Sequence, residues 1–289
     1  MVGINVQCRL GNQLFQYAFI KALAERFHTS FYLNEKMEPF TVANYFDLEG
    51  YSPTRNKINK LLLKLESGNL IKKLQATDVD TYSEAVSNAL TNRTIYNGYF
   101  QSELFFKDIA AKIPAYIRVK KEHVDKFQAQ YKNTFANNRT IAVHIRRGDY
   151  LNLNDWWATN LGSNNLSLPT SYYLKCLEQV PDYKNHKIIF VSDDIEFART
   201  EFAHIQNAEF SQSDMITDFQ IIMNADACIL SNSSFAWWAA YLNPKKDKAI
   251  YCPQYWLGFK IEKEYPENII PAGWNQIKVE SAIEANTAE

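Results

Sequence analysis

The chain has 289 residues, and its 31 lysines and arginines nearly balance its 32 aspartates and glutamates, giving a formal net charge of −1. This balance excludes a strongly basic nucleic-acid-binding protein and an acidic tail protein, so we expect no nucleic acid among its partners. With 46% hydrophobic and 22% charged residues, the composition is that of a folded globular protein. The length indicates two domains of roughly 150 residues each.

The N-terminal part predicts a β-α-β unit followed by a less regular stretch, and we assign residues 1–136 to a first domain. Its predicted elements are, in chain order, a strand over residues 2–6, a turn over 9–13, a helix over 14–27, a strand over 31–33, a helix over 59–65, a strand over 94–100 and a surface helix over 122–131.

From residue 137 onward, apolar strands alternate with helices in the rhythm of a parallel sheet. We assign residues 137–279 to this second domain and residues 280–289 to a flexible tail. The predicted strands cover residues 141–145, 188–191, 227–230 and 249–251, and the predicted helices cover residues 171–180, 218–224 and 235–242.

Each of the first three strands of this domain ends in a polar cluster. The clusters are Arg146-Arg147-Gly148-Asp149, Ser192-Asp193-Asp194 and Ser231-Asn232-Ser233-Ser234. Ligands of open α/β sheets bind beyond the carboxyl ends of the strands, so these clusters predict a site at one edge of the sheet.

The two adjacent arginines predict a phosphate ligand, because the guanidinium fork matches phosphate oxygens. Alternation along a strand lets only one of Arg146 and Arg147 point into the site. Ion pairs with Asp149 or Asp155 explain the arginines equally well, and the residues alone leave both interpretations open.

The cluster that starts at Ser231 precedes a helix-forming run, so its side chains suit the helix N-cap and the free N–H groups suit an anion. A plain cap on a buried helix is the alternative. Asp193 and Asp194 are predicted to hold a divalent cation or to accept hydrogen bonds from a base or ribose; a carboxylate paired with guanine would select that base.

Other motifs exclude several classes of protein. Asp78-Val79-Asp80 has the D-x-D spacing of metal-dependent sugar transferases, but it follows a lysine-rich segment and is interpreted as a solvated surface pair. His144 lies within an apolar strand, where a core histidine is the more common case, and the histidines lack zinc-ligand spacing. Dinucleotide-binding, P-loop and serine-hydrolase motifs are absent.

The cysteines and the N-terminus bear on the compartment. Cys8, Cys176, Cys228 and Cys252 are widely spaced and are predicted to be buried thiols in a reducing compartment. The sequence contains neither an export signal nor a run of 18 apolar residues, so we expect a cytoplasmic protein without a membrane span.

Four motifs carry a family resemblance, in order and in register: residues 9–18, 144–150, 191–194 and 231–238. With them the chain resembles the bacterial α-1,2-fucosyltransferases, a branch of the group that includes α-1,6- and protein O-fucosyltransferases. The resemblance runs from about residue 2 to about residue 257. The sequence departs from the family at Cys8-Arg9, where many relatives have two glycines.

The resemblance implies an α/β fold with two facing Rossmann-like lobes, the type B glycosyltransferase architecture. It implies that the C-terminal lobe holds GDP-β-L-fucose and that the first lobe is the acceptor side. The implied reaction is an inverting transfer of fucose to the 2-hydroxyl of a galactose, with no metal and no other cofactor. The implied acceptor is a galactose-terminated oligosaccharide or a lipid-linked glycan, which allows peripheral contact with a membrane.

The same resemblance assigns roles to residues. In the donor site, Arg146 contacts the diphosphate, Asp193 or Asp194 the guanine, and Ser233 and Ser234 the phosphates, with His144 and Phe235 beside them. On the acceptor side lie Asn12, Gln13 and Asp149. The catalytic residues are Arg146 and Asn12.

Some choices stay open at this point. The general base is unassigned, with Asp149 and Asp155 as candidates, and Trp156 and Trp157 suit sugar stacking and ordinary packing equally. Two other functions compete with the fucosyltransferase: a transferase of the same fold with another nucleotide sugar or linkage, and a catalytically silent nucleotide- or glycan-binding protein.

Overall fold

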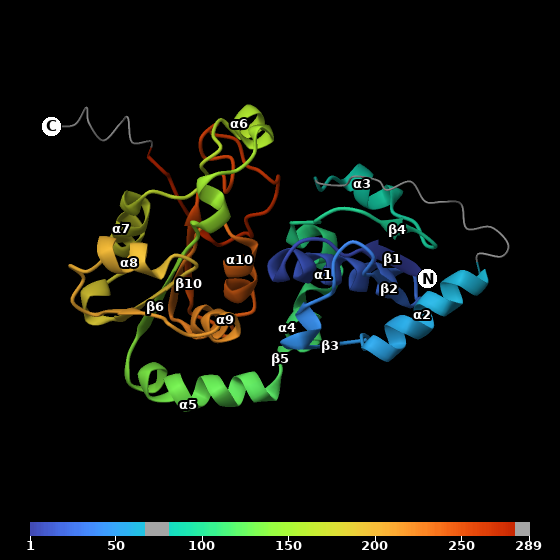
Figure 1. Ribbon diagram of the computed structural model, residues 1–289, viewed down its shortest axis with the longest axis horizontal. Coiled ribbons are helices and arrows are strands. Elements are labelled where there is room, and N and C mark those ends of the chain that lie inside the picture. The colour runs from blue at the N-terminus through green and yellow to red at the C-terminus, as the bar shows by residue number, and fades with distance from the viewer. Residues whose placement is uncertain (67–80, 281–289) are drawn as a thin grey trace. The chain divides into compact units, whose positions relative to one another are not determined.

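The computed structural model describes residues 1–66 and 81–280 (Figure 1). They form two compact units. Unit 1 comprises residues 1–120 and 266–269, and unit 2 comprises residues 121–265 and the chain from residue 270 onward. The predicted D-x-D pair and the predicted tail beyond Glu280 lie outside the described residues.

Unit 1 contains the predicted β-α-β unit. Its parallel sheet has the order β2-β1-β4, with β1 (Val2–Asn5) between β2 (Phe31–Asn34) and β4 (Ile95–Tyr96). Helix α1 (Leu10–Arg26) links β1 to β2 and begins four residues before the predicted start, because Gln13 N–H already bonds to the Arg9 carbonyl (3.0 Å). Residues 9–13 therefore form the first turn of a helix instead of a separate turn.

The remaining elements of unit 1 surround this sheet. They are η1 (Val42–Asn44), β3 (Phe46–Leu48), α2 (Pro53–Glu66), α3 (Glu84–Ala89), η2 (Glu103–Lys112), α4 (Ile113–Tyr116) and β5 (Ile117–Val119), with β3 and β5 paired antiparallel. The core of the unit is aromatic: Phe19 of α1 stacks on Phe100 with ring centroids 3.6 Å apart, and Phe105 meets both rings edge-on.

Unit 2 is built on a six-stranded, wholly parallel sheet of order β11-β10-β9-β6-β7-β8. The four predicted strands are confirmed, and two short strands join them at the edges. The strands are β6 (Thr140–Ile145), β7 (Lys187–Ser192), β8 (Ala208–Phe210), β9 (Ala227–Ile229), β10 (Ala249–Pro253) and β11 (Asn275–Ile277).

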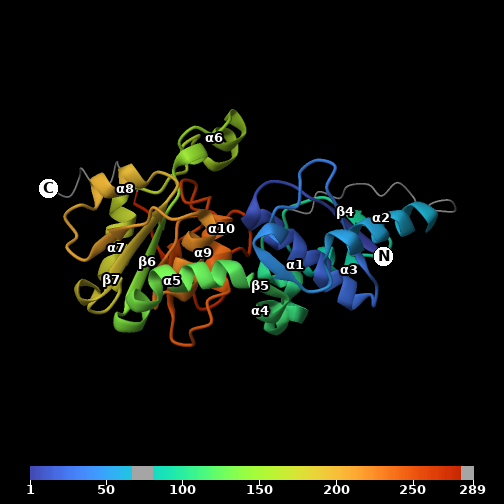
Figure 2. The same cartoon turned by 60° about the horizontal axis from the view of Figure 1, so that its bottom comes forward.

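Helices cover both faces of this sheet. Figures 1 and 2 show α7 (Thr170–Gln179) and α8 (Ile195–Glu201) on one face, and α9 (Met215–Asn224), α10 (Ser234–Tyr241) and α5 (Lys121–Asn137) on the other. The segments η3 (Gly148–Leu151) and α6 (Asp155–Leu161) follow β6, and η4 (Tyr183–Asn185) precedes β7.

Helix α5 belongs to unit 2, which moves the boundary from residues 136/137 of the sequence prediction to residues 120/121. The physical reason is its packing on α9. Phe127 is 2% exposed, and Gln220 of α9 donates from Nε2 to the His123 carbonyl (3.0 Å).

No helix among residues 1–66 and 81–280 is both long and apolar enough to cross a membrane.

Candidate functional site

The three polar clusters meet where the order of the sheet in unit 2 reverses. From β6 the chain continues outward to β7 and β8, then returns to β9 on the other side of β6. Such a reversal leaves a crevice between the carboxyl ends of the two strands that flank it, which is where open α/β sheets bind ligands. Arg146 directly follows β6, and Ser231 follows β9, so the predicted convergence is present in the fold.

Direct hydrogen bonds hold the cluster after β9 against the cluster after β6. Ser231 N–H donates to the His144 carbonyl (3.1 Å), and the His144 Nδ1 and Ser231 Oγ atoms are hydrogen-bonded at 2.8 Å. Tyr150 Oη donates to the Asn232 carbonyl (3.2 Å), and Asn232 Nδ2 donates to the Leu166 carbonyl (2.9 Å). The start of α10 is therefore fixed beside the segment that carries Arg146.

Arg146 is held by two carboxylates. Its Nη1 lies 2.9 Å from Asp193 Oδ2 and its Nη2 lies 2.5 Å from Asp149 Oδ1, while its guanidinium carbon lies 5.6 Å from the centre of the Tyr150 ring. The ion pair with Asp149 is one that the sequence offered as an alternative to a phosphate. The second partner is Asp193, and not Asp155 as the sequence suggested.

Arg147 takes a different direction. Its Nε lies 3.1 Å from Asp194 Oδ2, and its guanidinium carbon lies 3.5 Å from the centre of the Phe197 ring on α8. The Arg147 side chain therefore packs against α8, whereas the Arg146 side chain contacts Asp149 and Tyr150 of η3. The two arginines diverge, as strand alternation predicts.

Asp193 and Asp194 position the arginines and begin a helix. Asp193 accepts from Arg147 N–H through Oδ1 (2.9 Å) and from Arg146 through Oδ2. Asp194 is the N-cap of α8, accepting from Phe197 N–H through Oδ1 (3.2 Å), and its Oδ2 accepts from Arg147. Both carboxylates thus have structural partners, which the guanine assignment from sequence did not anticipate.

The structure adds a carboxyl group that the sequence analysis missed. Asp218, in the first turn of α9, accepts a hydrogen bond from Ser211 Oγ (2.5 Å), and Ser211 follows β8 at the same edge of the sheet. Burial raises the pKa of Asp218 to about 7. A partly buried carboxyl with a raised pKa at the carboxyl edge of the sheet is a functional candidate. An aspartate inside the apolar run 215–223 was the signal available in the sequence.

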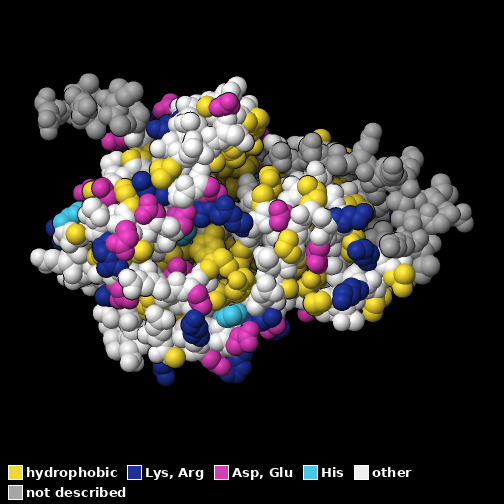
Figure 3. Space-filling view, viewed as in Figure 1, with side chains coloured by type: hydrophobic (Ala, Val, Ile, Leu, Met, Phe, Trp, Pro, Cys, Tyr) yellow, Lys and Arg dark blue, Asp and Glu magenta, His cyan; other side chains and the backbone are white. Residues whose placement is uncertain are grey.

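Helix α10 begins without a side-chain cap. Ser233 occupies the N-cap position, but its hydroxyl makes no capping bond, so the N–H groups of the first turn depend on other acceptors. The aromatic ring of Phe235 packs between His144 (centroids 5.6 Å apart) and Phe219 (5.4 Å). An uncapped helix start at a sheet edge suits an anion. Figure 3 shows Lys and Arg side chains beside a surface of hydrophobic side chains where α10 lies.

His144 positions this cluster and does not face the solvent. It is 5% exposed, and burial, with a smaller effect of the Arg146 charge, lowers its pKa to about 3. The imidazole is therefore neutral at physiological pH and serves to hold Ser231. This role differs from the donor contact predicted for His144.

In unit 1, the two predicted acceptor-side residues have different roles. Gln13 is 1% exposed, and its amide donates to the Cys8 and Pro39 carbonyls (2.8 and 2.9 Å) and accepts from Thr41 N–H and Oγ1 (2.8 and 3.1 Å). Its side chain is thus a structural link, and an acceptor-binding role for Gln13 stays a prediction.

Asn12 is partly exposed on the first turn of α1. Its Oδ1 accepts from Gln101 Nε2 (2.7 Å), which fixes the orientation of the amide. With the oxygen engaged in this way, the Nδ2 group is the donor that Asn12 can offer to a substrate.

The turn before α1 keeps a glycine-like backbone without glycine. Cys8 has φ = 59°, in the left-handed region, and its thiol is exposed, whereas Cys176, Cys228 and Cys252 are buried. The prediction that the cysteines are buried is therefore wrong for Cys8. Its conformation is one that glycine adopts without strain.

Near the site in unit 2, α6 carries the two tryptophans whose role the sequence left open. Trp156 is 48% exposed and meets Trp157 edge-on at 5.2 Å and Tyr265 at 6.1 Å. Asn154 caps the helix by accepting from Trp156 N–H (3.2 Å).

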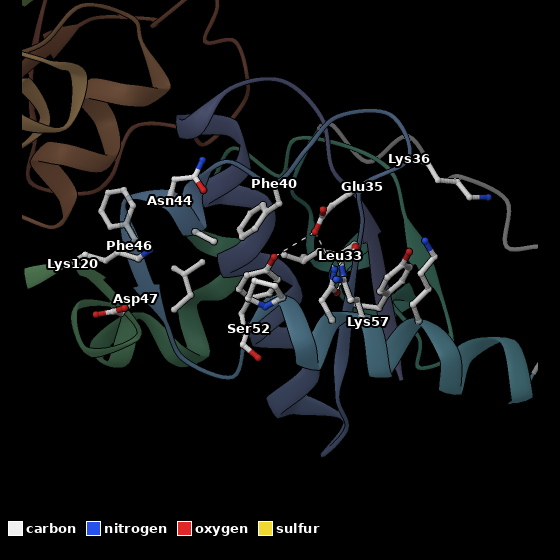
Figure 4. Close-up of a pocket in the computed structure, with 17 residues that line it drawn as sticks. Leu33, Glu35, Lys36, Phe40, Asn44, Phe46, Asp47, Ser52, Lys57 and Lys120 are labelled. Carbon is white, nitrogen blue, oxygen red and sulfur yellow. Dashed lines mark hydrogen bonds between the residues drawn. The ribbon is translucent and has the colours of Figure 1, made fainter. Parts of the chain in front are cut away.

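Unit 1 also contains a pocket of about 770 Å³ that the sequence did not predict (Figure 4). It lies between α2, β2 and η1, and its walls combine aromatic rings with lysines. The lining includes Lys36, Phe40, Tyr51, Lys57 and Lys60. None of the predicted site residues lines it.

Within the described ranges, no three or more His, Cys, Asp or Glu side chains are grouped so that they could hold a metal ion.

Comparison with solved structures shows the fold. The chain is similar to the fucosyltransferase NodZ from Bradyrhizobium, with a TM-score of 0.56, 14% identity, and coverage of 84% of this chain and 92% of that chain. A structure of NodZ α-1,6-fucosyltransferase soaked with GDP-fucose matches over the same shares with a TM-score of 0.54 and 14% identity. The predicted fold class, α/β with the type B glycosyltransferase architecture, is thereby confirmed.

Two curated proteins from Escherichia coli are similar in sequence. The O-antigen biosynthesis glycosyltransferase WbnK is 32% identical over 139 residues, which is 44% of this chain and 42% of WbnK. An alpha-1,2-colitosyltransferase is 24% identical over 299 aligned positions, which cover 94% of this chain and 96% of that protein. The profile of glycosyl transferase family 11 matches residues 1–278. Because this match spans nearly the whole sequence, the chain belongs to glycosyl transferase family 11.

Proposed function

We propose that the chain transfers L-fucose from GDP-β-L-fucose to the 2-hydroxyl of a galactose in a glycan acceptor, with inversion and without a metal ion. The observation that supports this most strongly is that hydrogen bonds hold the segment that follows Arg146 against the segment before the uncapped start of α10, at the strand reversal of unit 2. A guanidinium and a helix N-terminus side by side provide two kinds of anion binding, as a diphosphate requires.

In the proposed donor complex, Arg146 exchanges part of its pairing with Asp149 and Asp193 for the diphosphate oxygens. The N–H groups at the start of α10 and the hydroxyls of Ser233 and Ser234 bind from the other side. Negative charge grows on the leaving diphosphate as the sugar bond breaks, so donors fixed at this position stabilise the transition state more than the ground state. This arrangement supplies the neutralisation that a metal ion supplies elsewhere.

Guanine has three candidate partners. Asp193 and Asp194 already bind the arginines, whereas Asp218 has a hydroxyl donor as its partner and lies beside Phe219, which contacts Phe235. We therefore include Asp218 with the two predicted aspartates as a group that could accept from the ring N–H and amine of guanine. A carboxylate in this position discriminates against bases that lack those donors.

On the acceptor side, we propose that Asn12 orients the galactose hydroxyl through Nδ2, since Gln101 already binds its oxygen. The attacking hydroxyl loses its proton late in a loose transition state, so orientation contributes more than a strong base. We assign no general base. The similarity to WbnK, whose name places it in O-antigen biosynthesis, supports a glycan as the acceptor.

The test is transfer from GDP-fucose to galactose-terminated oligosaccharides in the presence of EDTA, with the linkage of the product determined. Arg146→Ala should lower kcat/KM by about 10²- to 10³-fold, the usual effect of removing one fixed donor at a developing charge. Arg146→Lys is the matched control, because it keeps the charge but loses the planar fork, and it should retain part of the activity. GDP release at background level with every galactoside would contradict the proposal.

A second candidate donor is nucleotide-activated colitose, favoured by the match to the alpha-1,2-colitosyltransferase over 94% of this chain. Colitose is fucose without its 3-hydroxyl. A site that binds that hydroxyl with a buried polar group rejects the deoxy sugar strongly, whereas an apolar site discriminates weakly. Competition between the two activated sugars in one reaction, read by product mass, decides between the donors.

A further inference from the structure

Helix α2 turns polar side chains toward the protein. Asn56 and Asn59 are 9% and 6% exposed and bond to the backbone of β2. Asn56 accepts from Leu33 N–H (2.9 Å) and donates to the Leu33 carbonyl (3.0 Å), and Asn59 donates to the Phe31 carbonyl (2.7 Å). Because β2 is an edge strand, these asparagines satisfy backbone groups that a sheet edge leaves unpaired.

The opposite face of α2 is apolar and faces outward. Ile58, Leu61 and Leu62 are 54%, 58% and 43% exposed. At about 100° of rotation per residue, these three side chains share an arc of about 100° on the side of the helix away from Asn56 and Asn59. A surface helix of a globular protein normally has the reverse arrangement, with its apolar face buried. The outer face of α2 therefore requires a partner with an apolar interior.

Basic side chains flank this apolar face. By the same geometry, Lys57 lies on one side of it and Arg55 on the other, with Lys60 next to Lys57. In sequence, residues 53–66 contain four basic residues and one acidic residue. Since the whole chain has a formal net charge of −1, this positive charge is a local feature of α2.

The apolar exposure of unit 1 is concentrated in the same place. The large hydrophobic side chains that are exposed among the described residues of unit 1 are Met37, Ile58, Leu61 and Leu62. Met37 adjoins Lys36, which lines the pocket of unit 1 together with Lys57 and Lys60 (Figure 4). The exposed apolar side chains of α2 and the lysines that line the pocket thus belong to the same helix and its neighbourhood in unit 1.

We propose that α2 lies flat on an anionic lipid surface. Ile58, Leu61 and Leu62 enter the boundary of the acyl chains, and Arg55, Lys57 and Lys60 bind the head-group phosphates. An apolar face with basic residues on both flanks is the arrangement of interfacial helices. A purely apolar groove on another protein would leave the basic side chains without a partner. An anionic bilayer accommodates both the apolar face and the basic side chains that flank it. The inference is independent of the donor and acceptor proposed above.

The test is co-sedimentation of the full chain with vesicles of phosphatidylcholine alone or mixed with phosphatidylglycerol. We expect binding to the anionic vesicles that weakens as salt is added. The double variant Leu61→Ser/Leu62→Ser should weaken binding by about tenfold or more. Lys57→Gln should weaken it by about fivefold, the effect of one basic residue near a charged surface.

The control is Ile261→Ser, which removes from unit 2 a side chain about as exposed (41%) as Leu62 and should leave vesicle binding unchanged. Thermal unfolding of each variant confirms that it is folded, which the exposure of Leu61 and Leu62 leads us to expect. Failure of the natural chain to bind anionic vesicles, or equal binding by the double variant, overturns the proposal. The proposal is also overturned if light scattering shows that the natural chain is a dimer and that, among the variants, only the double variant is a monomer. A second copy of the chain would then cover the apolar face.

Discussion

At the scale of single residues, the neighbours Asn12 and Gln13 separate a proposed substrate contact from a structural link. Gln13→Ala removes four hydrogen bonds and leaves partly buried partners such as Thr41 N–H unpaired. We expect the free energy of unfolding to fall by about 2–4 kcal/mol, measured by urea titration. Asn12→Ala is the comparison: unfolding should change little while transfer activity falls. Equal stability of the two variants would contradict the structural role of Gln13.

Cys8 has a backbone conformation that favours glycine. With φ = 59°, Cys8→Gly should be tolerated without loss of stability, because only glycine adopts this region freely. Cys8→Val should lower the free energy of unfolding by on the order of 1–2 kcal/mol, since a β-branched side chain is strained there. Chemical denaturation measures both variants, and a valine variant as stable as the glycine variant would contradict the assigned conformation.

Asp218 makes stability depend on pH. Burial raises its pKa from 3.8 to about 7, so the folded chain keeps a proton that the unfolded chain releases. Between these values, the free energy of unfolding falls as pH rises, by on the order of 1 kcal/mol per pH unit from this group. In Asp218→Asn this loss disappears. The free energy of unfolding of Asp218→Asn minus that of the natural chain should therefore increase steadily from pH 4 to pH 7.

His144 contributes in the opposite sense. Its pKa is lowered from 6.5 to about 3, so its contribution is present above pH 6.5 and is lost as pH falls toward 3. Both proteins contain His144, and subtraction removes its effect. A difference between Asp218→Asn and the natural chain that stays constant with pH would show that Asp218 is not protonated by the fold.

At the scale of elements, the ends of β6 and β7 fit closely. A Cβ atom at Gly148 would overlap Asp193 Oδ2, the oxygen that holds Arg146. We expect Gly148→Ala to displace this carboxylate and with it the guanidinium, weakening GDP binding by about tenfold, comparable to one misplaced charged hydrogen bond. Isothermal titration with GDP measures the effect. Unchanged affinity would show that the position of Asp193 does not control Arg146.

The elements that the sequence predicted are those with strong local patterns. Strands β6, β7 and β9 are short apolar runs followed by polar clusters, and this pattern specified both the sheet and its binding edge. Edge strands β8 and β11 have three residues each and contain polar side chains, so their pairing depends on the neighbouring strand and not on their own pattern.

Helix boundaries depended on contacts that no local pattern contains. The early start of α1 places Asn12 and Gln13 on a helix, and the packing of α5 on α9 moves the domain boundary. Roles depended on tertiary partners in the same way. Arg146 and Asp149 were recognised from sequence spacing, whereas the pairing of Asp193 with Arg146 and the burial of Asp218 arise only when β6, β7, β8 and α9 are assembled.

At the scale of the whole molecule, each unit has a separate task in the proposal. Unit 2 supplies the diphosphate site at its strand reversal, and unit 1 supplies Asn12 and the basic, apolar surface around α2. The balanced total charge does not show this distribution, because the positive charges are concentrated in two short segments, α2 and the arginines after β6. Sequence composition predicts no nucleic acid among the partners, and it could not locate either of the two proposed anion-binding surfaces.

The central claim is that Arg146 and the start of α10 together bind the diphosphate of the donor. A crystal structure of the chain with GDP tests it most directly. The account predicts phosphate oxygens within hydrogen-bonding distance of the Arg146 guanidinium and of the first N–H groups of α10. A nucleotide bound elsewhere, such as in the pocket beside α2, with Arg146 still paired only with Asp149 and Asp193, would contradict it.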